Sequence, residues 1–173
     1  MPVASGDMKV RYSVTSGSAG NSTAGTRAGS IGKYISTTDV PAPPNAFFDD
    51  VQSSEAAAGD TEYCCGFVLN DHATDSALNV TVQLVSEVAG GGATTLALDN
   101  IATSAKGSAS AQAAQVANED TAPSGVGTFD TTQKSIGTLT AGQCKAFWLK
   151  RTVSASTGAM TGDGFTVRVT FDG

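Results

Sequence analysis

Residues 61–70 read TEYCCGFVLN, and residues 78–84 read LNVTVQL. Both stretches carry an apolar side chain at every second position, which is the period of a β-strand with one buried face. The apolar positions are Tyr63, Cys65, Phe67 and Leu69 in the first stretch and Leu78, Val80, Val82 and Leu84 in the second. Residues 71–77 between them are polar and typical of a turn, so we expect the two strands to form an antiparallel hairpin.

The same period recurs along the chain and predicts further strands. It is present in residues 8–14, in 94–101 after a glycine turn, in 144–153, and in a closing edge strand at 165–171. Residues 50–59 have room for one helical turn ended by Gly59, while 104–125 lack an apolar stripe and predict a weak strand and loop. About seven to nine short strands are typical of an all-β, antiparallel two-sheet β-sandwich, either immunoglobulin-like or jelly-roll.

The alternation also predicts which side chains fill the core of this sandwich. We expect seven of them to lie between the two sheets: Phe67, Val80, Val82, Phe147, Leu149, Val167 and Val169. The three cysteines, Cys64, Cys65 and Cys144, occupy strand positions. Neighbouring strand residues point to opposite faces, so we expect reduced thiols that serve packing.

The N-terminal part has a different composition from the rest. Residues 13–30 are almost all Gly, Ser, Thr and Ala, so this segment has little to bury and predicts an extended arm. We divide the chain into a strand and arm at 1–45 and a sandwich domain at 46–173. We expect residues 1–30 to attach to neighbouring subunits, with Met8–Val14 adding to a foreign sheet. The alternative is that Met8–Val14 is the first strand of its own sandwich.

Charge and composition exclude several classes of partner. The formal net charge of the 173 residues is -6, and no cluster of Lys and Arg is present, which argues against nucleic acid. No stretch is long and apolar enough to cross a membrane, and the first residues lack the pattern of a secretion signal. We therefore expect a protein that is made in a cytoplasm and has neither nucleic-acid nor membrane partners.

Residues able to carry out chemistry are sparse. The only histidine, His72, falls in the polar turn at 71–77, where a surface position is expected. Asp49, Asp50, Glu55 and Asp60 are close in sequence, but their spacing does not match a calcium loop and favours a solvated turn. We expect no catalytic residues, no metal and no cofactor, and hence no enzyme.

Trp148 is the residue most suggestive of an interface. If Phe147 and Leu149 point inward, Trp148 lies on the other face of its strand, where either a loop of this chain or a partner must cover it. Together with the N-terminal strand, this gives a set of candidate interface residues. They are Val10, Tyr12, Val14, Arg27, Trp148, Lys150 and Arg151.

Two blocks of sequence resemble a family of tailed-phage and prophage virion proteins. The first block contains FDDV at 48–51 and AGDTEYCC at 58–65, and the second contains LTAGQ at 139–143 and WLKRTV at 148–153. The resemblance covers roughly residues 46–172. It implies an immunoglobulin-like surface domain of a virus particle and no catalytic residues.

A small acidic sandwich with an arm is similar to the decoration, or cement, proteins of bacteriophage capsids. The resemblance implies a non-enzymatic structural protein on the capsid surface of the virion, whose partners are the major capsid protein and neighbouring copies of itself, as a homo-oligomer or bound to the lattice. Two alternatives remain. One is a tail or neck component, and the other is a displayed carbohydrate-binding or adhesion module.

Overall fold

The computed structural model describes residues 2–17, 22–43, 46–87, 92–162 and 164–173. Nine strands and two short helices make up the regular structure of these residues. In chain order they are the 3-10 helix η1 (Ser5–Asp7), β1 (Met8–Val14), β2 (Tyr34–Asp39), α1 (Ser53–Ala58), β3 (Asp60–Asn70), β4 (Ala77–Val85), β5 (Ala93–Leu98), β6 (Ser104–Ala105), β7 (Lys134–Leu139), β8 (Gln143–Val153) and β9 (Thr166–Asp172). Helix α1 ends at Gly59, whose φ of 81° suits glycine, as the sequence predicts.

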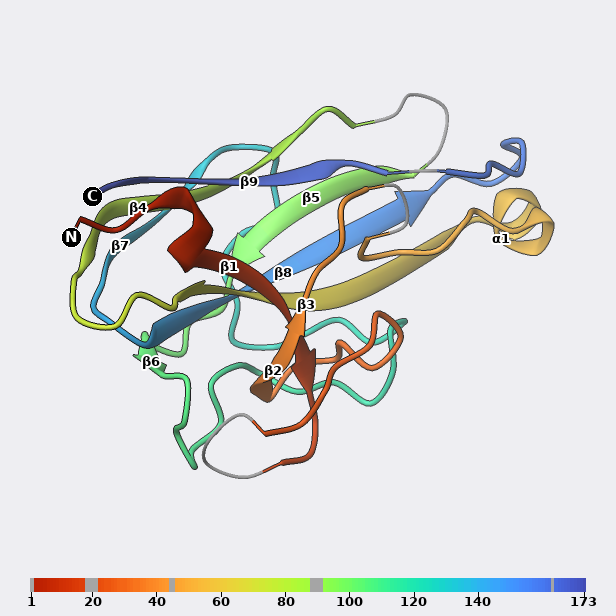
Figure 1. Ribbon diagram of the computed structural model, residues 1–173. Coiled ribbons are helices and arrows are strands. Elements are labelled where there is room, and N and C mark those ends of the chain that lie inside the picture. Colours follow the sequence, from red (N-terminus) through yellow and green to blue (C-terminus); the bar gives the residue numbers. More distant parts are fainter. Residues whose placement is uncertain (1, 18–21, 44–45, 88–91, 163) are drawn as a thin grey trace.

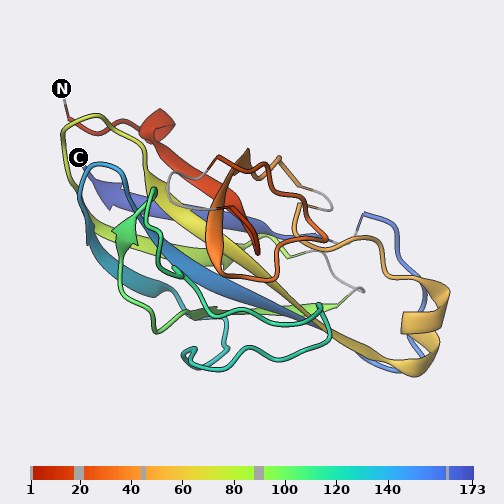
Figure 2. The ribbon, with the colours of Figure 1, turned by 90° about the horizontal axis from the view of Figure 1, so that it is seen from below.

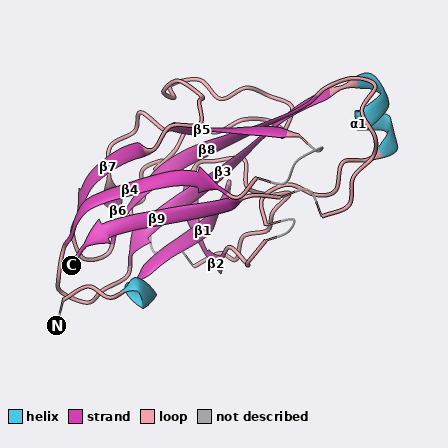
Figure 3. Cartoon of the chain, turned by 90° about the horizontal axis from the view of Figure 1, so that it is seen from above, coloured by secondary structure: helices cyan, strands magenta, loops and turns pink. Residues whose placement is uncertain are grey.

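The strands form two antiparallel sheets that pack face to face (Figure 1). The larger sheet has the order β2-β1-β3-β8-β5, with β6 paired to β8, and the smaller sheet has the order β7-β4-β9. Figure 3 shows the smaller sheet from its outer side, with β9 at the edge that lies above β1. The prediction of an all-β, antiparallel two-sheet sandwich is confirmed, with β8 central and β9 at an edge.

The expected hairpin between the strands at 61–70 and 78–84 is wrong. β3 pairs with β1 on one side and β8 on the other, and β4 belongs to the opposite sheet. The Asn70 side chain organises the crossing, because its amide donates to the carbonyl oxygens of Asp75, at 2.9 Å, and Leu139, at 2.8 Å. The physical reason is that β3 is apolar on both faces and therefore occupies the middle of a sheet, which leaves β4 no free edge beside it.

Both faces of the larger sheet are buried, and this divides the expected core in two. One face packs on the smaller sheet, and the core between them contains Phe147 and Leu149 of the larger sheet and Val80 and Val82 of the smaller one. Val167 and Val169 of β9 are partly buried beside them. Phe67 lies on the opposite face, in a second core with Trp148. The expectation that all seven residues lie between the sheets is therefore wrong for Phe67, although its side chain is fully buried.

A long loop of the same chain covers the second face. Figure 2 shows the segment from about residue 105 to 130 crossing β3 and β8 on the side away from the smaller sheet. Asp99 holds it there, since one carboxylate oxygen accepts hydrogen bonds from the Trp148 indole at 3.0 Å and from the Ala114 backbone amide at 2.7 Å. At Gly32 the backbone has a φ of 95°, and a Cβ would collide with the Ala114 carbonyl oxygen.

Met8–Val14 is an inner strand of the molecule's own larger sheet. It pairs with β3 from Met8 and Asn70 to Tyr12 and Gly66, and Tyr12 and Val14 are buried. The alternative stated above therefore holds for this strand, and the expectation that it stands outside the sandwich as an attachment arm is wrong. Within the Gly/Ser/Thr-rich stretch, residues 18–21 lie outside the described residues, as does residue 1.

The three thiols are free and buried. Burial raises the pKa of Cys64 and Cys65 far above the ordinary value, and raises that of Cys144 to about 12. Cys65 pairs with Trp148 while Cys144 pairs with Leu69, so these two thiols are four positions apart along the ladder. Among the described residues, neither helix has the length and apolar character that crossing a membrane requires.

Truncation of Phe147 tests the core between the sheets. We expect Phe147→Ala to lower the free energy of unfolding by about 3–5 kcal/mol, because the ring is fully buried among apolar neighbours. The measurement is urea unfolding at equilibrium. Leu78→Ala in β4 is the control, since this side chain is 46% exposed and its loss should cost under about 1 kcal/mol. Equal effects of the two changes would contradict the assignment of the core.

Deletion of residues 1–14 tests the place of β1. We expect the shortened chain to lose its cooperative thermal transition, because the deletion exposes one edge of β3 and removes the buried Tyr12 and Val14 side chains. Circular dichroism against temperature measures this. A shortened chain that melts within a few degrees of the full chain would show that the strand is dispensable.

Candidate functional site

The structure separates the seven candidate interface residues. Tyr12 and Val14 are buried, and Trp148 and Arg151 are 0% and 1% exposed. Of the two interpretations of Trp148, the one in which a loop of this chain covers the ring is the one observed. The remaining three are half-buried: Val10 in β1, Arg27 between β1 and β2, and Lys150 in β8. The set does not form one continuous interface.

Arg151 is the centre of a buried polar cluster at one end of the sandwich. Its Nε and one terminal nitrogen lie 2.6 and 2.5 Å from a Glu62 carboxylate oxygen, and its other terminal nitrogen donates to the Asp49 carbonyl at 2.5 Å. The guanidinium also stands 5.0 Å from the centre of the Phe48 ring. Glu62 and Arg151 are direct partners across the β3–β8 ladder, so the pairing of the two strands brings the charges together.

The sequence contained a signal for this pair. Arg151 follows Phe147 and Leu149 at the same period of two, and Glu62 precedes Cys64 in the same way, so both belong to inward-facing positions. A charged residue at such a position is buried only when it is paired. The register between the strands, which the sequence does not show, supplied the partner.

The acidic residues near α1 are engaged in local contacts. Glu55 accepts from the Gln52 amide at 2.9 Å, Asp60 from the Thr61 amide at 2.7 Å, and Asp50 from the Gly162 amide at 2.8 Å. A different set, Asp49, Glu55 and Glu62, offers oxygens within 4.8 Å of one another. Arg151 already binds two of these three residues and offsets their charge, as expected for a structural ion cluster.

His72 holds a turn together. Its Nδ1 accepts hydrogen bonds from the backbone amides of Thr74, at 3.2 Å, and Asp75, at 2.9 Å. The ring is therefore an acceptor in the connection between β3 and β4, which agrees with the turn position expected from the sequence.

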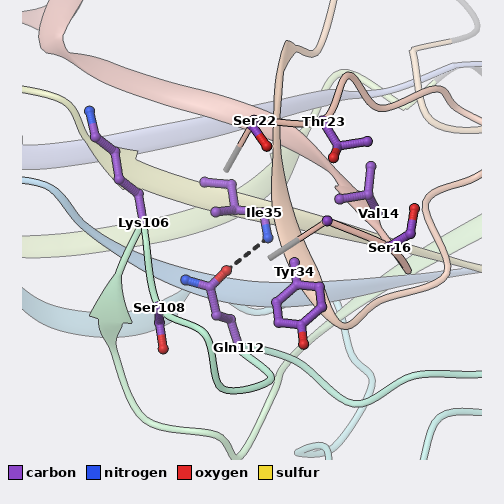
Figure 4. Close-up of a pocket in the computed structure, with 10 residues that line it drawn as sticks. Val14, Ser16, Ser22, Thr23, Tyr34, Ile35, Lys106, Ser108 and Gln112 are labelled. Atoms are coloured by element: carbon purple, nitrogen blue, oxygen red, sulfur yellow. Dashed lines mark hydrogen bonds between the residues drawn. The ribbon is translucent and has the colours of Figure 1, made fainter. Parts of the chain in front are cut away.

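The hollow shown in Figure 4 is too small for a ligand larger than water. It lies between β2 and the loop near Gln112 and has a volume of about 10 Å³. Gln112 closes it: the side-chain oxygen accepts from the Ile35 amide at 3.0 Å, and the side-chain nitrogen donates to the Ala105 carbonyl at 2.8 Å. The site anchors the loop to the edge of β2.

A larger groove lies between the first residues of β1 in the larger sheet and the start of β9 in the smaller sheet. Its volume is about 380 Å³. Val10 and Val40 form one wall, Phe47 lies at the base, and Phe165 and Val167 form the other wall. We call this the β1–β9 groove. Val10 is the only candidate interface residue among those that line it.

Aromatic stacking fixes the base of the groove. The Phe47 ring stacks on Phe165 with centroids 6.1 Å apart and meets Tyr12 and Phe147 edge-on at 6.0 and 5.9 Å. The Tyr12 hydroxyl donates to the Ala46 carbonyl. Sequence analysis missed this site, because Phe47 lies in an irregular segment outside any period of two, and the only signal was an apolar Phe47-Phe48 pair after a proline-rich turn.

The charge state of Glu62 gives a pH-dependent prediction. Burial, together with the nearby Glu55 and Glu119, raises the pKa of Glu62 to about 7, although Arg151 acts in the opposite direction. The folded chain then binds a proton more tightly than the unfolded chain, so this residue's contribution is complete below about pH 4.5 and declines as the pH rises towards 7. We expect wild type to lose stability relative to Glu62→Gln between these pH values.

Urea unfolding of both proteins at several pH values measures the difference in their free energies of unfolding. All other titrating groups are common to the two proteins, so their contributions cancel in this difference. A wild type that instead gains stability relative to Glu62→Gln as the pH rises would show that the Arg151 contact outweighs burial.

Comparisons with known proteins identify no relative of this chain. No protein-family model matches the chain, and neither a curated protein nor a solved structure is significantly similar to it.

Proposed function

We propose that this chain is a non-enzymatic structural protein of a phage virion, most simply a capsid decoration protein that binds the lattice of the major capsid protein. Its partners are that protein and neighbouring copies of itself. The proposal rests on the resemblance of residues 48–65 and 139–153 to tailed-phage virion proteins and on the character of the β1–β9 groove.

The groove is the single structural observation that supports binding over chemistry. Its walls and base are largely apolar, and the polar side chains at its rim are Lys9, Asp39 and Thr166. Asp39 is held by Arg11 Nε at 2.8 Å. Such a surface suits burial against another protein.

Multivalent binding is the mechanism that follows from this role. Each copy buries a modest area, and repetition over a lattice turns weak contacts into a strong combined attachment. A rigid sandwich suits this task, because the buried β3–β8 pair needs no rearrangement when the outer surface binds. The net charge of -6 keeps free copies apart in solution until they bind the lattice.

Two other roles remain as alternatives. A tail or neck protein would use the same kind of surface at a lower copy number, and a displayed adhesion module would bind carbohydrate. Described aromatic side chains are mainly buried in the cores or the groove base, which favours a protein partner over a sugar-stacking platform.

The composition of purified particles tests the proposal. We expect the chain to be present in a number comparable to the major capsid protein, measured by quantitative mass spectrometry of intact particles. A number equal to a single ring of subunits would favour the tail or neck. Absence from the particles, or saturable binding on a glycan array, would contradict the decoration role.

A further inference from the structure

The four outer edges of the two sheets differ in how they are closed. On the larger sheet, the Thr37 amide of β2 donates to the Thr23 carbonyl at 3.0 Å, and Leu96 of β5 exchanges two backbone hydrogen bonds with Asp130, at 2.9 and 3.2 Å. Loops of the same chain therefore cover both of these edges. This is the usual protection of a sheet edge against foreign strands.

The smaller sheet is protected at β7 in another way. The pairing of β4 with β7 shifts register between Ala77 and Val80 and again between Val80 and Thr81, and Gly137 has a φ of 88°. Lys134 stands at the start of this strand. Irregular register and a lysine both make an edge unsuitable for pairing with another chain.

The first half of β9 lacks these features. It pairs with β4 without a shift of register from Val85 and Thr166 to Thr81 and Thr170, and the one shift, between Leu78 and Thr81, lies towards the far end of the strand. Among the described residues no strand pairs with its other side. Its first residues, together with Phe165, form a wall of the β1–β9 groove. A row of backbone donors and acceptors thus runs beside an apolar hollow. Figure 3 shows β9 at the edge of the smaller sheet, above β1.

We propose that the first half of β9 and the β1–β9 groove are the docking site for an extended segment of a second protein, which adds to the smaller sheet as an antiparallel or parallel strand. Backbone pairing with β9 holds the segment, and an apolar side chain at every second position enters the groove. This deepens the proposed function, on which it rests for the source of the segment, a protein of the particle.

The chain's own features favour a foreign segment over a second copy. A symmetric pairing of two β9 strands over their whole length is hindered at the far end, where a Cβ on Gly173 would stand 2.6 Å from the Val3 carbonyl oxygen. Two copies would also bring together chains of net charge -6. A short segment with an apolar centre needs only the first half of β9, and basic ends are attracted to a chain of negative net charge.

A synthetic peptide tests the site without any virus particle. The probe is acetyl-Lys-Thr-Val-Thr-Val-Thr-Val-Thr-Lys-amide, titrated into isotope-labelled full chain and followed by amide chemical shifts. We expect saturable shifts at residues 165–168 and 8–10. A matched peptide in which two central threonines are replaced by proline should lose the effect, because proline cannot pair as a central strand.

Two variants of the chain locate the binding. Ala42 is exposed and lines the groove, so Ala42→Trp fills the groove without disturbing a core, and we expect the peptide affinity to fall by about tenfold or more. Ala122→Trp is the control, since Ala122 is also exposed and belongs to the loop over the other face of the larger sheet. The Ala122→Trp variant should bind the peptide with the same affinity as wild type.

Several outcomes would overturn the docking site. These are the absence of saturable binding, shifts that map away from β9, equal binding of the proline peptide, or a dimer in sedimentation equilibrium that Ala42→Trp dissociates. The result is separable from the proposed function. Peptide binding at β9 with no copies in particles would defeat the decoration role alone, and abundant copies in particles without peptide binding would defeat the docking site alone.

Discussion

The structure depends on the pairing of β3 with β8. Their ladder runs unbroken from Asp60 and Val153 to Leu69 and Cys144, and both faces of the pair are buried. A strand pair that is apolar on both sides needs two covering layers, and the chain supplies them from different sources. The smaller sheet covers one face, and the loop held by Asp99 covers the other. The opposition of Gly66 and Phe147 shows how tightly the pair is fitted, because a Cβ at Gly66 would overlap the phenylalanine ring.

The same ladder positions the polar cluster. At its outer end the inward-facing row continues past Leu149 to Arg151, where apolar packing gives way to charge. Glu62 and Asp49 neutralise the guanidinium, and Phe48 packs on it. An ion pair therefore interrupts the apolar row before it ends at the buried Val153. Removing one partner alone would leave the other charge buried without compensation, which is the costly case for buried ion pairs. The cluster is therefore part of the fold, and its carboxylates serve Arg151.

The β1–β9 groove is a consequence of unequal sheets. The larger sheet has six strands and the smaller one three. The larger sheet therefore extends beyond β9, where β1 lies below it in Figure 3. The aromatic side chains of Phe47 and Phe165 fill the inner part of this step, and the outer part stays open as the groove. A partner that binds there leaves the two cores undisturbed, as expected for a protein with the structural role proposed above.

The sequence by itself determined the strands β1, β3, β4, β5, β8 and β9, the fold class, the small helix ended by Gly59 and the turn position of His72. Each of these depends on local period or turn chemistry. Tertiary structure alone decided how these elements pair. The period of two marked Phe67 and Phe147 as buried but did not show that they lie on opposite faces of one sheet, since a strand buried on both sides has no polar face to give direction. It likewise left open whether Trp148 meets a loop or a partner, and whether Met8–Val14 belongs to this sandwich or another. The groove depends on β1, Phe47 and the start of β9, which come from distant parts of the chain, and only long-range packing brings such residues together.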